Sequence, residues 1–264
     1  MKNKGNEKLI TRMARENPGI LPEKLKAKII AGVVQVDGEG IRDPNYKISS
    51  DAVLTEKKKR YVSRGGIKLE HALDLWKFPV ADRVFIDAGA STGGFTHCLL
   101  QKGARAVHAV DVGYNQLDYT IRKDNRVHVH ERTNIMDCTG FQPEADAAVA
   151  DVSFRSIVPV AGHLLRLTKA GKAVVLIKPQ FEYKDHDDDF KGVVESDTAL
   201  RSIVIDVVTR LLQSGIRAQD LCKSPILGRK GNVELFVLLS LPAMGEKIEY
   251  MRESVVQMVD RAIG

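Results

Sequence analysis

Residues 86–96 read IDAGASTGGFT, an apolar strand ending in an aspartate, then a glycine-rich loop, then the start of a helix. Segments of the same apolar kind follow it and alternate with helical patterns. The expected strands are RVFID, AVHAVD, VHVHE, DAAVAD and KAVVLIK, and helices are expected from Gly94, near Leu117 and around His163–Leu167. Such alternation predicts βαβ winding, that is, a Rossmann-like α/β fold with a mostly parallel sheet.

The C-terminal part continues this pattern with one change of direction. A long helix is expected over residues 197–214, and the apolar run VELFVLLSL, residues 233–241, reads as the last strand. Residues 216–222 leave only a short link between them, so we expect this strand to run antiparallel at the sheet edge. An amphipathic helix over residues 246–263 closes the chain.

The N-terminal part differs in charge and in pattern. Residues 1–68 contain 16 Lys/Arg against 8 Asp/Glu, whereas the net charge of the whole chain is only +6. Two short helices and a run of alternating strands with turn signals precede a basic linker. We therefore expect a small α+β domain over residues 1–55, a linker over 56–62 and the Rossmann-like domain over 63–264. The local positive charge favours a polyanionic partner, with RNA or DNA first.

Cysteine usage and hydropathy exclude several classes of protein. The 3 cysteines include no CxxC pair, which argues against a disulfide framework and a zinc site. No apolar run approaches the roughly 20 residues that span a bilayer, and the N-terminus lacks the apolar stretch of a secretory signal. We expect a cytoplasmic protein without a metal site.

The glycine loop allows three interpretations. As G-x-S-x-G it would place Ser91 as a hydrolase nucleophile, but no histidine follows residue 186 to complete a triad. As a dinucleotide fingerprint it has that serine where the second glycine should let a pyrophosphate approach. As a nucleoside-sulfonium site it needs no phosphate contact, and Asp111, ending the next strand, can accept hydrogen bonds from both ribose hydroxyls. The third interpretation is the best supported.

Seven segments stand out in chain order: YVSRGGIKLEHAL, FIDAGASTGGFT, AVDVGYNQL, ERTN, ADVSFRSI, LIKPQFE and SPILGRKGNVELF. Together they resemble the signatures of the hemolysin-A-type (TlyA) ribosomal RNA 2′-O-methyltransferases. The resemblance implies a Rossmann-like methyltransferase that uses S-adenosylmethionine and methylates cytidine riboses in ribosomal RNA or ribosomal subunits. The segment KLKAKIIAGVVQVDG similarly resembles the small RNA-binding domain shared by a ribosomal small-subunit protein, pseudouridine synthases and tyrosyl-tRNA synthetases.

The resemblance assigns a catalytic tetrad to Lys68, Asp151, Lys178 and Glu234. A ribose hydroxyl is a poor nucleophile at neutral pH, so its proton must be held or removed while the oxygen attacks the sulfonium methyl. Lys178, which ends a strand, is the best candidate for that role. A nearby Lys68 would favour its neutral form, whereas the two carboxylates would favour the ammonium and fix its position. The sequence leaves both possibilities open.

Further contacts follow from the same resemblance. The donor is expected against the glycine loop and the two following strand ends, at Gly89, Ser91, Thr92, Gly93, Asp111, Asn134 and Phe154. RNA contacts are expected at Lys24, Lys26 and Lys28 of the basic N-terminal part, where solubility is an equal explanation, and at Arg64, for which capping of the linker is the alternative. One segment departs from the family: the acidic stretch with Asp185 and Asp187–Asp189 replaces a glycine-rich loop, as a solvated surface or as a change in substrate choice.

Two other functions have some support in the sequence. A base-amine methyltransferase could use Asp151–Phe154 as a clamp for an exocyclic amine, but it would lack two prolines and leave the lysines without a role. A pore-forming hemolysin would need a membrane-insertable segment, which the sequence does not show. The expected activity is therefore RNA ribose 2′-O-methylation.

Overall fold

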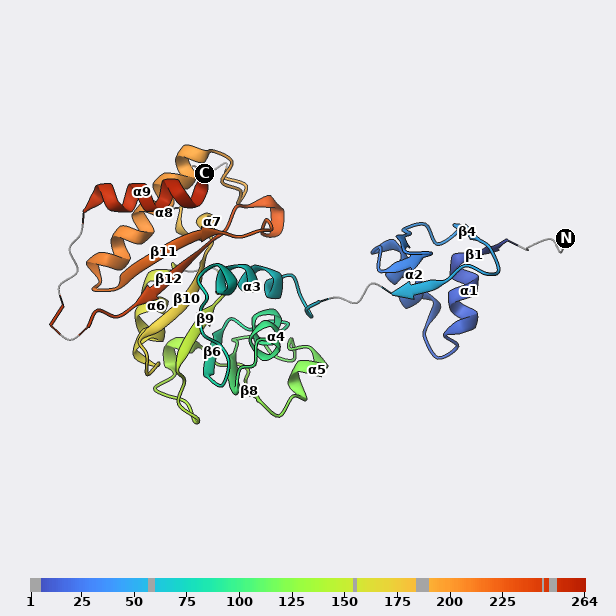
Figure 1. Cartoon of the computed structure of the whole chain (residues 1–264), viewed down its shortest axis with the longest axis horizontal. Coiled ribbons are helices and arrows are strands. Elements are labelled where there is room, and N and C mark those ends of the chain that lie inside the picture. The colour runs from blue at the N-terminus through green and yellow to red at the C-terminus, as the bar shows by residue number, and fades with distance from the viewer. Residues whose placement is uncertain (1–5, 57–59, 154–155, 184–189, 244, 247–250) are drawn as a thin grey trace. The chain divides into compact units, whose positions relative to one another are not determined.

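The computed structural model describes residues 6–56, 60–153, 156–183, 190–243, 245–246 and 251–264 (Figure 1). It divides into two compact units, Met1–Lys59 and Arg60–Gly264.

The first unit packs two helices against short strands. Helices α1 (Leu9–Glu16) and α2 (Pro22–Ile30) accompany strands β1 (Glu7–Lys8), β2 (Val34–Val36), β3 (Glu39–Gly40), β4 (Lys47–Ile48) and β5 (Leu54–Glu56). β2 lies between β3 and β5, and β1 pairs with β4. Leu9, Leu25 and Ile29 are fully buried in a core of its own. Apolar side chains at helical spacing therefore give this small unit a separate hydrophobic centre.

The second unit is built on a seven-stranded sheet in the order β11-β12-β10-β9-β6-β7-β8. The bounds are β6 (Val84–Ala88), β7 (Ala106–Val110), β8 (Val127–His130), β9 (Ala147–Ala150), β10 (Lys172–Ile177), β11 (Arg217–Lys223) and β12 (Leu235–Ser240). Strands β10, β9, β6, β7 and β8 run parallel, whereas β12 runs antiparallel to β10 and β11. The Rossmann-like prediction with an antiparallel last strand is confirmed.

One detail of that prediction is wrong. Residues 217–223, most of them expected in the link over 216–222, form strand β11 at the edge, and the last strand β12 lies inside the sheet between β10 and β11. The segment RAQDLCK hides its strand pattern because the pairing shifts between Ala218 and Asp220. A bulge of this kind breaks the strict alternation from which strands are read.

Helices cover both faces of the sheet. On one face α6 (Ile157–Arg166), α8 (Asp197–Gln213) and α9 (Arg252–Ile263) share a core with alternate strand residues such as Ile86 and Val237. On the other face α3 (Gly65–Leu75) and α4 (Gly94–Gln101) pack on Phe85 and Phe236. Because successive strand residues point to opposite faces, one sheet supplies both cores. Burying each large apolar side chain stabilises the fold by about 1.5–3 kcal/mol.

The helices agree closely with their predicted positions. α4 begins at Gly94, α8 covers 197–213, and the short α5 (Tyr119–Arg122) begins two residues after Leu117 because the Asp118 side chain caps it through Thr120 N at 2.9 Å. Short segments α7 (Pro179–Glu182), η1 (Ile135–Asp137) and η2 (Arg229–Gly231) complete the unit. The parallel strands all end at one edge of the sheet, which is where the ligand of such a fold is expected.

Candidate active site

The glycine loop after β6 lies directly against the end of β9. Gly89 has φ +83°, and a Cβ atom there would lie 2.7 Å from the Asp151 carbonyl oxygen. Glycine is the residue that adopts this backbone region without strain and without a clash. The loop and the Asp151 backbone therefore form one continuous wall.

Asp87, the last charged residue of β6, anchors this loop from below. Its Oδ2 accepts hydrogen bonds from Thr96 N at 2.9 Å and from Thr96 Oγ1 at 2.6 Å, which ties the strand end to α4. Its Oδ1 has no hydrogen-bond partner among the described residues. Burial raises the pKa of Asp87 to about 7, although both bonds from Thr96 act to lower it.

A first cavity of about 450 Å³ opens beside the loop, over the ends of β6, β7 and β9. Asp111 lies in its wall, where its carboxylate accepts hydrogen bonds from Ser91 N and from Gly113 N, both at 2.7 Å. Asn134 lies in the same wall and caps η1 through Met136 N at 3.1 Å. Val112, Ile135 and Met136 add apolar surface.

The chemistry of this first cavity fits a cationic nucleoside. Its described lining holds the carboxylates of Asp111 and Asp151 and contains no Lys or Arg. A dinucleotide pyrophosphate would face the Asp111 carboxylate and no cation of the lining, because the neighbouring Lys178 is paired with Asp151, whereas the positive charge of a sulfonium nucleoside is compatible with these acidic walls. Val112 is 71% exposed and offers an apolar face for a purine ring. The residues present therefore fit S-adenosylmethionine, and we refer to this space as the donor cavity.

The four tetrad residues form two lysine–carboxylate pairs. Nζ of Lys178 lies 2.6 Å from Asp151 Oδ1 and donates a hydrogen bond to Ser153 Oγ at 2.7 Å. Oδ1 of Asp151 receives no directed hydrogen bond from the described residues, so this contact is an ion pair. Lys68 Nζ pairs with Glu234 Oε2, and those side chains are only 10% and 4% exposed.

Sheet register explains why these residues meet. Ile177 at the end of β10 pairs with Leu235 at the start of the antiparallel strand β12. Lys178 and Glu234 therefore come to the same edge of the sheet, although one follows a strand and the other precedes one. Gly228 makes room for Glu234, because a Cβ at Gly228 would lie 2.2 Å from the Glu234 carboxylate.

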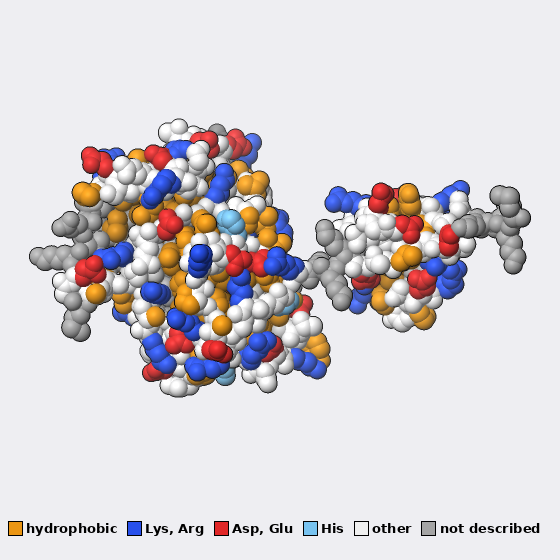
Figure 2. All heavy atoms as spheres, viewed as in Figure 1, with side chains coloured by type: hydrophobic (Ala, Val, Ile, Leu, Met, Phe, Trp, Pro, Cys, Tyr) orange, Lys and Arg blue, Asp and Glu red, His pale blue; other side chains and the backbone are white. Residues whose placement is uncertain are grey.

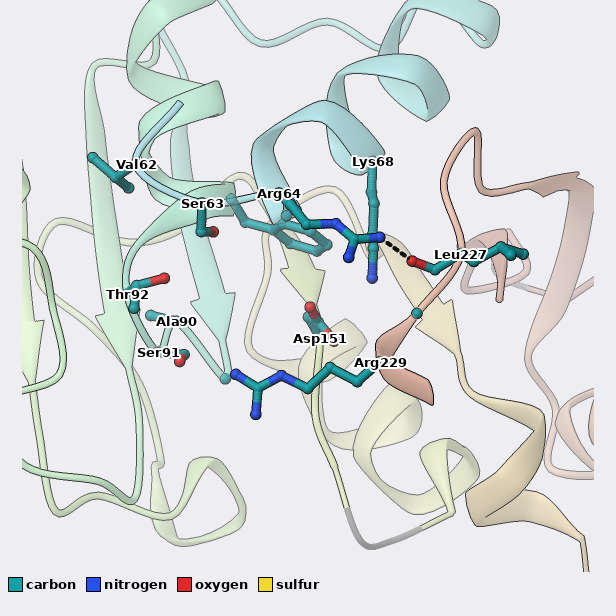
Figure 3. Close-up of a pocket in the computed structure, with 15 residues that line it drawn as sticks. Val62, Ser63, Arg64, Lys68, Ala90, Ser91, Thr92, Asp151, Leu227 and Arg229 are labelled. Atoms are coloured by element: carbon teal, nitrogen blue, oxygen red, sulfur yellow. Dashed lines mark hydrogen bonds between the residues drawn. The ribbon is translucent and has the colours of Figure 1, made fainter. Parts of the chain in front are cut away.

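A second cavity, of about 370 Å³, lies on the other side of the Asp151 wall (Figure 3). Lys68 and Asp151 line it together with Ser63 and two arginines, Arg64 and Arg229. Gly89, Ser91 and Asp151 belong to the linings of both cavities. Of the tetrad, Asp151 lines both cavities and Lys68 lines this one, whereas Lys178 and Glu234 line neither and reach the site through their ion pairs with those two residues. Asp151 thus lies where a donor in one space could meet an acceptor in the other, and we refer to this second space as the acceptor cavity.

The remaining expected residues are distributed unevenly. Thr92 lines the acceptor cavity, and Gly93 lies outside both linings, where a Cβ would lie 2.8 Å from Leu117. Arg64 donates a hydrogen bond to the Leu227 carbonyl. In the first unit Lys24 and Lys26 are exposed, whereas Lys28 pairs with Glu56 at 2.7 Å. Phe154 and Asp185–Asp189 lie outside the described residues.

Sequence reasoning missed Arg229, Gln116 and Thr133, which line the two cavities. Gln116 stands in the signature AVDVGYNQL and Thr133 in ERTN, so membership in these segments was the available signal. Arg229 has the same signal in SPILGRKGNVELF. None of the described helices is long and apolar enough to cross a membrane. The described residues contain no group of three His, Cys, Asp or Glu side chains placed to hold a metal ion.

Known proteins resemble this chain over most of its length. Residues 61–241 match the family described as FtsJ-like methyltransferase. YqxC of Bacillus subtilis, provisionally named an rRNA methyltransferase, is 40% identical over 253 residues, which cover 91% of this chain and 88% of that protein. TlyA of Mycobacterium tuberculosis, a 16S/23S rRNA (cytidine-2′-O)-methyltransferase, is 40% identical over 218 residues, 79% of this chain and 80% of that protein. A Streptococcus thermophilus structure, provisionally named a hemolysin, matches with TM-score 0.72 and 33% identity, covering 98% of this chain and 96% of that one.

Proposed function

This chain belongs to the FtsJ-like methyltransferase family, and from that premise we propose that it methylates the 2′-hydroxyl of a cytidine ribose in ribosomal RNA. The observation that carries the proposal is the double lysine–carboxylate pair at the wall between the donor and acceptor cavities. Such a group suits a hydroxyl nucleophile, which needs its proton held and removed. The substrate is ribosomal RNA or a ribosomal subunit, and the reaction belongs to the cytoplasm.

S-adenosylmethionine would supply the electrophilic methyl group and keep the electron pair of the broken carbon–sulfur bond. Asp111 would hold its ribose hydroxyls, because each carboxylate oxygen has acceptor capacity left beside its bond to a backbone amide. Asn134 and Val112 would contact the adenine, and the Gly89 backbone would lie along the methionine part. These residues bind and orient the donor without entering the chemistry.

The Lys178–Asp151 pair would handle the proton of the attacking hydroxyl. A proton passing from the Lys178 ammonium to the Asp151 carboxylate would leave Nζ neutral, and its lone pair would then take the ribose proton, so that the new oxygen–methyl bond leaves no net charge on the oxygen. Lys68 lines the acceptor cavity and would orient the ribose, with Glu234 fixing its position. Ser153 holds Nζ in place through its hydroxyl.

The first unit would supply affinity for RNA. It has its own core and the exposed lysines Lys24 and Lys26, and it belongs to the basic part of the chain. Charge of this kind acts on the phosphate backbone and makes binding depend on salt. We therefore assign residues 1–55 to RNA binding and not to methyl transfer.

The test is Lys178→Ala, with Lys172→Ala at the exposed start of β10 as the matched control. We expect Lys178→Ala to bind S-adenosylmethionine by calorimetry and to lose about 10²–10⁴-fold in turnover on ribosomal RNA, a typical contribution of an acid–base group. The control should stay fully active. The product of the active enzyme should resist alkaline cleavage at the modified nucleotide, because a methylated 2′-oxygen cannot attack its phosphodiester. An alkali-labile, base-methylated product would instead support the base-amine alternative.

A further inference from the structure

Two guanidinium groups stand at the acceptor cavity and take no part in the tetrad. Arg64 and Arg229 both line this cavity. The formal charges of the tetrad cancel, because two lysines face two carboxylates. The two arginines therefore give this group of six side chains a formal charge of +2. A cavity of that charge selects an anion, in contrast to the donor cavity, whose described lining contains no Lys or Arg.

The two arginines are placed differently. Arg64 donates a hydrogen bond to the carbonyl of Leu227 and so holds the loop that precedes η2. Arg229 is exposed, and no described residue forms a hydrogen bond or an ion pair with its guanidinium. Figure 3 shows its side chain extending across the acceptor cavity, past Asp151, toward the loop at Ser91. Of the two, Arg229 is therefore the one available to a ligand.

Backbone hydrogen bonds fix the loop that carries Arg229 and thereby fix the direction of its side chain. Gly228 N donates to the Asn232 carbonyl at 2.8 Å, and Ser224 N donates to the Glu234 carbonyl at 2.8 Å. Gly228 also packs directly on the Glu234 carboxylate, which fixes the position of the loop relative to this residue of the tetrad. Asn232 is only 2% exposed and joins this loop to residues 192 and 194 through its side chain.

The chemistry of the substrate requires an anion beside the tetrad. In RNA the 2′-hydroxyl and the 3′-phosphodiester are attached to neighbouring carbons of one ribose. A site that holds the 2′-oxygen must therefore accommodate that phosphate close by. A planar guanidinium can bind two phosphate oxygens at once, whereas an ammonium acts as a point charge.

We propose that Arg229 binds the phosphodiester on the 3′ side of the target ribose and thereby presents the 2′-hydroxyl to Lys178 and Asp151. Arg64 supports this contact by fixing the Leu227 carbonyl and with it the loop. The inference rests on the proposed function, since it assumes a ribose acceptor in an RNA chain. It adds a binding site for one particular phosphate to the methyl-transfer site.

The experiment compares Arg229→Ala and Arg229→Lys with Arg166→Ala, an arginine of the α6 C-terminal turn that lines neither the donor nor the acceptor cavity. Methylation of ribosomal RNA is measured as a function of RNA and of S-adenosylmethionine concentration. We expect Arg229→Ala to raise the KM for RNA about tenfold to a hundredfold, as for a lost charge-assisted contact, and to leave the KM for the donor unchanged. Arg229→Lys should recover part of the loss, and Arg166→Ala should match the wild type.

A second readout is the salt dependence of RNA binding. Losing one phosphate contact should lower the slope of log affinity against log salt by about 1 in Arg229→Ala only. An unchanged KM for RNA with an unchanged slope would overturn the inference, as would a loss confined to kcat. Lys178→Ala, assayed on the same RNA, separates the two claims: if it is inactive while Arg229→Ala behaves as wild type, the phosphate site fails and the methyltransferase stands.

Discussion

Glu182→Ala should cost both stability and turnover, although Glu182 lines neither cavity. Its side chain is only 2% exposed. Oε1 accepts a hydrogen bond from Ile157 N at 2.6 Å, and Oε2 accepts one from Arg210 Nη2 at 2.9 Å. Ile157 begins the helix after the Asp151 segment, and Glu182 ends the short helix after Lys178. The Glu182 carboxylate thus connects the segment after Asp151 with the segment after Lys178, and these two residues form one ion pair of the tetrad.

The expected cost follows from these contacts. A hydrogen bond to a charged group contributes about 1.5–3 kcal/mol. Removing one partner of a buried pair costs about 3–5 kcal/mol, because the other partner is left uncompensated. Arg210 is 21% exposed and keeps its ion pair with Asp206 at 2.8 Å, so we expect the lower end, about 3 kcal/mol. That is a large share of the roughly 5–15 kcal/mol by which a domain is stable.

Urea denaturation and methylation assays on the same preparations measure both effects. Glu182→Gln is the matched variant, because it keeps an oxygen for Ile157 N but loses the charge and the acceptor for Arg210, and it should lie between wild type and alanine. Glu144→Ala, whose side chain is 65% exposed, should change the free energy of unfolding by less than about 0.5 kcal/mol. A Glu182→Ala protein with wild-type stability and turnover would refute the reasoning.

Two further changes test the walls of the donor cavity, and a third tests the buried Asp87 beneath the glycine loop. Gly89→Ala should weaken donor binding at least tenfold, about 1.4 kcal/mol by calorimetry, because its Cβ would lie 2.7 Å from the Asp151 carbonyl; unchanged affinity would contradict this packing. Asp111→Ala should cost about 1–3 kcal/mol of donor affinity and free Ser91 N, whereas equal affinity would move the donor elsewhere. The pKa of Asp87, about 7, lies above its ordinary 3.8, so its contribution to stability is complete below about pH 4 and is lost as the pH rises through about 7. The free energy of unfolding of Asp87→Asn should therefore rise relative to that of the wild type between about pH 4 and about pH 7, as measured by denaturation at a series of pH values. A difference between the two proteins that stays constant over this range would contradict the raised pKa.

The sequence predicted the sheet and its glycine loop because a buried strand leaves a continuous apolar signal. It also placed Asp151 and Lys178 at strand ends, where parallel strands bring side chains to one edge. It could not predict which lysine pairs with which carboxylate. That choice depends on register: only the antiparallel pairing of Ile177 with Leu235 brings Glu234 to this edge, where its partner is Lys68.

Two other features escaped prediction for different reasons. Strand β11 was taken for part of a link because its bulge at Ala218 and Asp220 interrupts the alternation. Arg229 stands in the signature segment SPILGRKGNVELF, but that segment does not show where its side chain lies, because this depends on tertiary packing, in which Gly228 fits against the Glu234 carboxylate. The local sequence does not predict this contact between Gly228 in the loop and the side chain of Glu234, six residues later.

The pair of Lys68 with Glu234 joins residues separated by 166 positions in the chain. A nascent chain emerging from the ribosome therefore has α3 and its lysine long before the matching carboxylate exists. β12 must also pair with β10 before that carboxylate reaches its place. Contacts so distant in sequence form late, since loop closure must come first. The complete active site should therefore form only at the end of folding. A partly folded chain would have no active site with which to act on RNA.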